Sequence, residues 1–207
     1  MQIPVLYSYR RCPYAMRARM ALAYANIAVE IREVSLKQKP ASMVQLSPKG
    51  TVPVLVLTDG KVIEQSLEII DWALQRSDTD DWKMQDDLRQ QTLANELIHL
   101  NDSAFKQALD KYKYAIRFPE NPPAIYRTQG EQFLQRLESL LNQKSYLCRE
   151  TCSKADIAIF PFVRQFSMVD EAWFEAAKYP ALKAWLNGLL RSDLFTKVMQ
   201  KYPTWLD

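Results

Sequence analysis

The run Tyr9-Arg10-Arg11-Cys12-Pro13-Tyr14-Ala15-Met16-Arg17-Ala18-Arg19 follows a short apolar stretch, Val5-Leu6-Tyr7, where a strand is expected to lead into a helix. Proline suits the first position of a helix, because the N–H that it lacks would have no partner there and its fixed φ is already helical. Pro13 therefore predicts that Cys12 is the N-cap of a helix from about Pro13 to Tyr24. The sulfur is then expected to face the N–H groups of the first turn and the positive end of the helix dipole.

The surroundings of Cys12 favour a thiolate. Four arginines lie within seven residues of it on either side, and no acidic residue appears before Glu30. A free thiol has a pKa of roughly 8.5, whereas nearby cations at a helix N-terminus can bring the pKa to roughly 3.5 to 7.5. The sequence therefore predicts a nucleophile at Cys12. The alternative is a small buried hydrophobic residue, which is the role of most lone cysteines.

Length and composition indicate a folded protein of one large or two small domains. The chain has 207 residues, of which 48% are hydrophobic and 25% are charged, and both values are near the averages for folded domains. No apolar stretch approaches the roughly 20 residues of a membrane span, and Met1-Gln2-Ile3-Pro4 lacks the pattern of a signal peptide. We expect a cytoplasmic protein with no membrane partner.

The cysteines and the single histidine argue against a disulfide framework and against a metal site. Cys12, Cys148 and Cys152 are an odd number in a chain without an export signal. With only His99 beside them, a zinc site would be short of ligands. We expect Cys148, Cys152 and His99 to be packing residues.

The net charge of +3 arises entirely in the first part of the chain. Residues 1–79 contain 10 Lys and Arg against 7 Asp and Glu, and residues 80–207 contain 17 of each. Such a modest excess near Cys12 suits a small anionic ligand better than a nucleic acid. The segment Lys111–Arg117 alternates bases with aromatic residues and could by itself be a nucleic-acid patch, but a helix end near a ligand cleft is the favoured interpretation.

The first 77 residues predict a thioredoxin-like α/β domain. The expected elements are a strand at 5–7, a helix at 13–24, a strand at 28–34, a helix at 40–46, two β segments at 52–57 and 62–63, and a helix opened by Ser66. A helix of that length between the first two strands implies a parallel βαβ unit. Asp59-Gly60 is typical of a hairpin turn and predicts that the two later β segments are antiparallel.

The rest of the chain predicts an all-helical domain over residues 83–207, with 78–82 as the linker. Long amphipathic stretches predict helices at about 83–118, either continuous or broken, and at about 123–142, 154–168, 180–190 and 194–202. The spacing of Ser153 and Asp156 predicts a capping box at the third of these, with Asp in place of the usual Glu.

With these segments placed, the chain resembles the cytosolic glutathione transferase superfamily, and within it the cysteine-type branch, most closely the omega class. The resemblance covers both domains and is most specific between Leu6 and Ile70. It is carried by the run from Tyr7 to Arg19, by Leu36-Lys37-Gln38-Lys39-Pro40, by Ser47–Leu55 and by Val62-Ile63-Glu64-Gln65-Ser66, in the order and at the spacing of the family. This resemblance implies a thioredoxin-like N-terminal domain followed by an all-α domain.

The resemblance also implies roles for individual residues. Cys12 matches the cysteine that forms a mixed disulfide with glutathione, and Pro53 matches a cis-proline that lets the backbone of Val52 bind the tripeptide. Lys39 matches a lysine near the glycine carboxylate, and Ser66 matches the helix-start residue that receives the γ-glutamyl carboxylate. Carboxylate binding at a helix start also has its own physical basis in free N–H groups and the dipole. Pro53 could alternatively be an ordinary strand-entry proline and Ser66 a simple N-cap.

Two positions depart from the family pattern. Gln65 stands where the omega class usually has glutamate, so a charged partner of the γ-glutamyl ammonium is replaced by a neutral one. Ala15 stands where dithiol glutaredoxins have a second cysteine, so the protein is expected to be monothiol. The bound glutathione would then be removed by a second glutathione.

The expected function is that of a glutathione-dependent thiol transferase or reductase acting through a mixed disulfide at Cys12, in deglutathionylation or a dehydroascorbate-type reduction, with glutathione as co-substrate and no metal. Its second substrate is expected to be a small electrophile or disulfide, bound between the domains. Candidate walls are Tyr14, Tyr112, Tyr114 and Trp173, although packing in the core or at an interface is the favoured role of each. Tyr14 is also counted among the glutathione-binding residues. The alternatives are a conjugating glutathione transferase and a non-catalytic binding module of the same fold. The family usually forms homodimers, and a homodimer is expected here.

Overall fold

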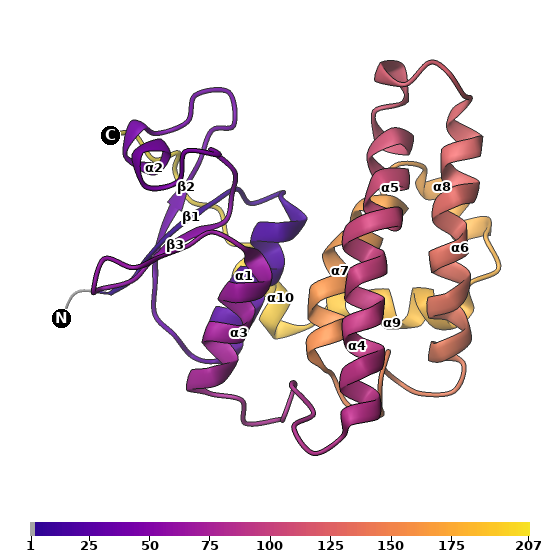
Figure 1. Cartoon of the computed structure of the whole chain (residues 1–207). Helices are drawn as coiled ribbons and strands as arrows, with labels where there is room; N and C mark the ends of the chain where they lie inside the picture. The colour runs from indigo at the N-terminus through magenta and orange to yellow at the C-terminus, as the bar shows by residue number, and fades with distance from the viewer. Residues whose placement is uncertain (1–2) are drawn as a thin grey trace. The chain divides into compact units, whose positions relative to one another are not determined.

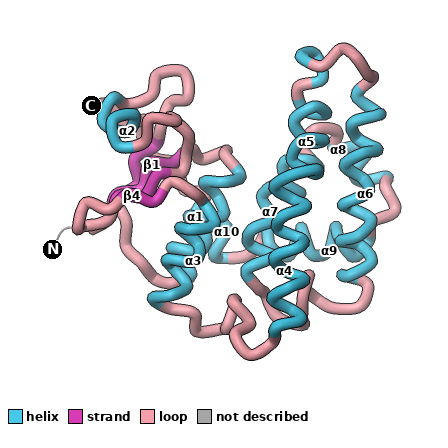
Figure 2. Tube along the Cα trace, viewed as in Figure 1, coloured by secondary structure: helices cyan, strands magenta, loops and turns pink. Residues whose placement is uncertain are grey.

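The computed structural model describes residues 3–207 and divides the chain into two compact units. Unit 1 comprises the chain up to Asp80 together with Arg191–Asp207, and unit 2 comprises Asp81–Leu190. Figure 1 follows the chain through both units, and Figure 2 separates helix from strand. Among the described residues, no helix is long and apolar enough to cross a membrane.

Unit 1 is built on a four-stranded sheet with the strand order β2-β1-β3-β4. The strands are β1 (Val5–Ser8), β2 (Glu30–Glu33), β3 (Val54–Val56) and β4 (Val62–Ile63). β1 and β2 are parallel, as the length of the intervening helix predicts, and β3 is antiparallel to both β1 and β4. The expected hairpin is present, with Gly60 at φ +85° in its turn. The thioredoxin-like prediction for this part of the chain is confirmed.

The two faces of the sheet carry different helices. On one face, Tyr7 and Val54 form a buried cluster with Met43 of α2 (Ala41–Leu46). On the other face, α1 (Pro13–Tyr24) packs against α3 (Ser66–Arg76). α1 is buried around most of its circumference, since every residue from Ala15 to Leu22 is buried.

The end of the chain belongs to unit 1, which corrects the expected domain limits of 83–207. The helix α10 (Asp193–Val198) packs on α1 and buries Phe195 and Val198. After it, Thr204 forms a parallel bridge with Glu33, and the N–H of Trp205 donates to the carbonyl of Glu33 at 2.8 Å. Because β2 is an edge strand, its free side accepts this segment.

Unit 2 contains only helices, as predicted. They are α4 (Leu88–Leu100), a π-helical turn η1 (Asn101–Phe105), α5 (Lys106–Lys113), a short 3-10 helix η2 (Ala115–Arg117), α6 (Pro123–Leu141), α7 (Lys154–Ser167), α8 (Glu171–Ala176) and α9 (Pro180–Leu190). The long helix expected at 83–118 is therefore divided into four pieces, and α8 was missed by the sequence. His99 is exposed, so the expectation that it is a packing residue is wrong.

The helix α7 forms the centre of unit 2. Every residue from Ala155 to Val163 is buried, and the predicted capping box at Ser153 and Asp156 is present. The Asp156 carboxylate accepts hydrogen bonds from the N–H groups of Ser153 and Leu147, at 2.9 and 3.0 Å, and from the indole N–H of Trp185 at 2.9 Å. Burial raises the pKa of the Asp156 carboxyl, and these hydrogen bonds oppose that rise. The cap thus ties α7 to the preceding loop and to α9.

Candidate functional site

The structure places Cys12 at the N-cap of α1, as its sequence context predicts. Cys12 has extended backbone angles, φ −77° and ψ 121°, and Pro13 occupies the first helical position. The N–H of Cys12 donates to the carbonyl of Tyr9 at 3.0 Å, which closes a tight turn immediately before the helix. The Cys12 side chain is partly exposed, so small reagents can reach it. We call residues 9–12 the Cys12 turn.

The sulfur of Cys12 does not cap the helix. Its side chain makes no capping hydrogen bond, and its thiol instead donates to the backbone carbonyl of Val52 at 3.8 Å. The peptide bond between Val52 and Pro53 is cis, as the family resemblance implies. A carbonyl oxygen accepts a proton from S–H but repels a negatively charged sulfur. An ionised Cys12 would therefore have to turn from Val52 toward the start of α1.

The buried Arg19 and the half-buried Glu33 hold the backbone of the Cys12 turn. The guanidinium of Arg19 donates to the carbonyls of Tyr9 and Arg10, at 3.4 and 2.9 Å, and also to the hydroxyl of Ser8. From β2, the Glu33 carboxylate accepts the N–H of Arg10 at 2.7 Å. Burial lowers the pKa of Arg19 to about 10, so the guanidinium stays charged at neutral pH. Arg19 thus shapes the turn through hydrogen bonds as well as adding positive charge near the sulfur.

Arg17 links α1 to the start of α3. It is 2% exposed, and its Nε–H donates to the hydroxyl of Ser66 at 2.9 Å. Its guanidinium also lies 4.9 Å from the centre of the Tyr14 ring. Ser66 is the first residue of α3 and Gln65 is its N-cap, so the alternative of Ser66 as a simple N-cap is wrong. A buried cation beside a helix start is a favourable site for a carboxylate.

The acid directly before Gln65, Glu64, is bound to other residues of the chain. Gln65 is exposed, and the neighbouring Glu64 accepts a hydrogen bond from Ser47. The Glu64 carboxylate also lies 3.8 Å from the ammonium of Lys49. The acid next to Gln65 is thus already engaged with a hydroxyl and a lysine of the chain.

Lys39 lies against the loop that carries the cis-proline. Gly50 in this loop has φ +60°, and a Cβ added there would stand 3.3 Å from the Lys39 ammonium. Glycine is suited to both demands, because it adopts positive φ without strain and leaves room for the lysine. Val52 follows two residues later and is 8% exposed. Lys39 and Val52 thus belong to one edge of unit 1.

The last residues of the chain contact α2, which follows Lys39. The Asp207 carboxylate accepts hydrogen bonds from the N–H of Ser42, at 3.0 Å, and from its hydroxyl. The Ser42 hydroxyl lies 3.0 Å from that of Tyr7, and Arg32 stacks 4.0 Å from the centre of the Trp205 ring. Because Ser42 lies in α2, directly after Lys39 and Pro40, residues 204–207 help to position that helix.

Sequence reasoning found Cys12 and the cis-proline, but it missed what holds them. It treated Arg17 and Arg19 as cations of a basic first turn, whereas both are buried and hydrogen-bonded. Their signal was present in the sequence, because they interrupt an otherwise apolar helix at residues 15–22. The contacts of Trp205 and Asp207 had no local signal.

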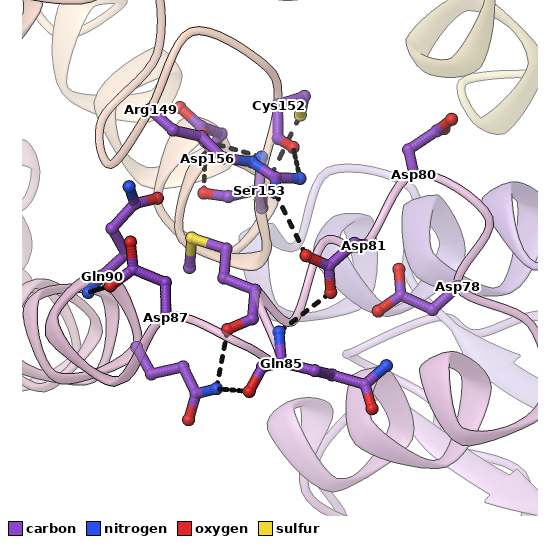
Figure 3. A network of polar contacts seen from close by, with 12 residues as sticks. Asp78, Asp80, Asp81, Gln85, Asp87, Gln90, Arg149, Cys152, Ser153 and Asp156 are labelled. Carbon is purple, nitrogen blue, oxygen red and sulfur yellow. Dashed lines mark hydrogen bonds and ion pairs between the residues drawn. The ribbon is translucent and has the colours of Figure 1, made fainter.

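The other two cysteines lie in unit 2. Cys148 is fully buried, and burial raises the pKa of its thiol to about 12. Cys152 is partly exposed and directly precedes the N-cap of α7. Figure 3 shows Arg149 between Asp81 and Cys152, where it donates to the Asp81 carboxylate at 3.4 Å and to the carbonyl of Cys152 at 3.2 Å. Among residues 3–207, no group of three or more His, Cys, Asp or Glu side chains could hold a metal ion.

Comparison with known proteins finds a family model that matches each part of the chain. The model of the glutathione S-transferase N-terminal domain matches residues 6–80, and that of the C-terminal domain matches residues 101–193. Glutathione S-transferase omega-1 of Rattus norvegicus is 26% identical over 202 residues, which are 96% of this chain and 77% of that protein. A probable maleylacetoacetate isomerase of Caenorhabditis elegans is 41% identical over 73 residues, about a third of each chain.

A solved structure shows the same fold. Glutathione transferase URE2P6 from Phanerochaete chrysosporium, crystallised in complex with oxidised glutathione, superposes with a TM-score of 0.79 at 18% identity, covering 94% of both chains. At that identity the likeness concerns the fold.

Proposed function

Since the chain belongs to the cytosolic glutathione transferase superfamily and is omega-like in sequence, we propose that it is a glutathione-dependent thiol transferase whose nucleophile is Cys12. The observation that carries the proposal is the position of this cysteine. It is partly exposed, stands at the N-cap of α1 with Pro13 behind it, and lies 3.8 Å from the backbone oxygen that precedes the cis-proline. A conjugating transferase would instead need a hydroxyl donor to the sulfur of glutathione in that place.

The proposed reaction is two successive exchanges of one disulfide bond. The Cys12 thiolate attacks the glutathione sulfur of a mixed disulfide, the S–S bond of the substrate breaks, and the substrate leaves as a thiolate that takes a proton from water. Cys12 is then joined to glutathione. The thiolate of a second glutathione attacks the bound glutathione sulfur, glutathione disulfide leaves, and the Cys12 thiolate is restored.

The surrounding residues would hold the tripeptide. The backbone of Val52 would bind its cysteinyl part, and the contact between the Cys12 thiol and the Val52 carbonyl would be given up when the sulfur ionises. The start of α3 at Ser66, with Gln65 beside it and Arg17 and Tyr14 behind it, would receive the γ-glutamyl end. This pairing is supported by the 2.9 Å hydrogen bond from Arg17 to Ser66, which places a cation where that carboxylate would lie.

Lys39 would bind the glycine carboxylate at the opposite end of the tripeptide. Its ammonium already lies against Gly50, two residues before Val52. The three anchoring groups at Lys39, Val52 and Ser66 would thus come from three separate segments of unit 1, which are joined only by the fold.

Intact mass spectrometry tests the proposal. After incubation with oxidised glutathione, the protein should gain one glutathionyl group, and this adduct should be absent from Cys12→Ser and retained in the matched control Cys152→Ser. With a glutathionylated peptide as substrate, Cys12→Ser should lose at least about a hundredfold in turnover, because the covalent step is removed.

A folded protein that forms no adduct at Cys12 would contradict the proposal and favour a non-catalytic binding module. Conjugation of an aromatic electrophile that survives in Cys12→Ser would favour a conjugating transferase. Isomerisation of a maleylacetoacetate analogue belongs in the same panel, because one similar protein bears the name of that isomerase.

We further propose a homodimer in the cytoplasm, the usual state of this superfamily. Light scattering of the purified chain tests the first part, because a monomer mass at micromolar concentration would contradict it.

A further inference from the structure

A cavity lies in unit 1, and Cys12 is not among its walls. It has a volume of about 280 Å³ and is formed by the second half of α1, the start of β2, and α10 with the segment after it. Its apolar walls are Leu22, Ile27, Val29, Ile31 and Val198. Ligand sites in proteins are typically about 300 to 1,000 Å³ with mostly apolar walls, so this cavity suits a small ligand.

The apolar walls are only partly covered by the protein itself. Ile27, Val29 and Ile31 line the cavity, and all three branched apolar residues are half-buried. A ligand that covered them would remove apolar surface from water, which is favourable by about 25 cal/mol per Å². The walls therefore favour a ligand with an apolar body.

The charged residues of the cavity are both cationic. Arg19 and Lys197 both line it, and none of its described lining residues is acidic. The donors of Arg19 are turned to other partners, namely the carbonyl of Val198 and the Cys12 turn. Lys197 is exposed and forms no ion pair with any residue of the described chain. Its ammonium is therefore available to bind an anion at the rim.

We propose that this cavity is a ligand site for an amphipathic monoanion, an aromatic or medium-chain carboxylate whose apolar body lies on Ile27, Val29 and Ile31 and whose carboxylate pairs with Lys197. The site is separate from the Cys12 site, because Cys12 and the proposed glutathione-binding residues lie outside its lining and the two sites share only Arg19. A neutral compound of the same shape should bind more weakly, since it lacks the partner for Lys197.

Photolabelling with 4-benzoylbenzoate tests the site on the full chain. The label should be found in peptides that contain residues 22–31 or 197–202, and neither saturating glutathione nor Cys12→Ser should remove it. Lys197→Glu should reduce the labelling about five- to tenfold, because an attraction is lost and a repulsion is gained. Lys201→Glu is the matched control, since it makes the same change of charge at a nearby exposed residue outside the cavity and should leave the labelling unchanged.

Three outcomes would overturn the proposal. They are labelling spread over other peptides, equal losses in the two lysine variants, and equal labelling by neutral 4-methylbenzophenone. Circular dichroism of each variant shows that it is folded. A failure of glutathione adduct formation at Cys12 would overturn the proposed function alone, because the photolabel does not depend on that residue.

Discussion

The chain contains two helix starts that each have a cysteine at or next to the N-cap and that differ in structure. α1 begins after Cys12 and α7 begins after Ser153, which Cys152 directly precedes. At α7, Asp156 receives the N–H groups of Ser153 and Leu147 and the indole of Trp185. At α1, the N-cap side chain makes no capping hydrogen bond. A helix start that is closed by its own residues stabilises the fold, whereas one left without a side-chain cap can serve a ligand.

The difference follows from what surrounds each start. The start of α7 lies inside unit 2, where an unpartnered N–H would cost about 1 to 3 kcal/mol. Cys12 is partly exposed, so water or a ligand can satisfy the N–H groups there. Arg19 and Glu33 form hydrogen bonds with the backbone of the Cys12 turn and leave the sulfur partly exposed.

The largest expected contrast is in the reactivity of the cysteines. With a pKa of about 12, the thiol of Cys148 is ionised in about 1 molecule in 10,000 at pH 8, and it is fully buried. Iodoacetamide at pH 8 should therefore modify Cys12 first, Cys152 more slowly and Cys148 only after unfolding. Peptide mapping at successive times measures the order. Modification of Cys152 ahead of Cys12 would remove the distinction between the two helix starts.

Removing the cap at the start of α7 should lower the stability of the protein. Asp156→Ala leaves buried donors without an acceptor and is expected to lower the free energy of unfolding by about 3 to 4 kcal/mol, measured by denaturant unfolding. The matched control is Asp87→Ala at the N-cap of α4, a more accessible cap that accepts from Arg89 and Gln90 and should cost about 1 kcal/mol. Equal losses of unfolding free energy in the two variants would show that burial of the α7 cap does not increase its contribution to stability.

Weakening the hydrogen bonds between Arg19 and the Cys12 turn should have a smaller effect on stability. Arg19→Lys keeps a positive charge but cannot reach Tyr9, Arg10 and Val198 together. We expect about 2 kcal/mol lower stability and slower alkylation of Cys12. Arg11→Lys is the control, because Arg11 is exposed. An unchanged rate of Cys12 alkylation in a folded Arg19→Lys protein would show that Arg19 contributes only to stability.

The smallest expected effect concerns the end of the chain. Hydrogen bonds from Ser42 lower the pKa of the Asp207 carboxyl. Since the folded-state pKa lies below the unfolded one, the contact stabilises the protein above the unfolded pKa and is lost as the pH falls through the folded value. Acidification below about pH 4 should therefore change the fluorescence of the neighbouring Trp205 in the wild type. Asp207→Asn should remove this transition, and its persistence there would assign the change to another acid.

The predicted elements were most accurate where a local signal marks them. Pro13 begins α1, Asp59-Gly60 lies in the hairpin turn, and Ser153 with Asp156 forms the capping box. Predictions were least exact where the pattern was continuous. The stretch from 83 to 118 has no strong breaker, so the sequence allows a break in it but does not give the position, which the structure places at the π-helical turn Asn101–Phe105 and at Tyr114.

The amino-acid sequence alone determined where helices start, that Cys12 stands at such a start, and to which superfamily the chain belongs. Each of these depends on neighbouring residues or on a short ordered set of motifs. Only the tertiary structure decided that Arg17 and Arg19 are buried, that the Cys12 thiol meets the carbonyl of Val52, and that residues 191–207 join unit 1. These contacts join residues far apart in the chain, and burial of a charged group is tolerated only where the fold supplies its partners.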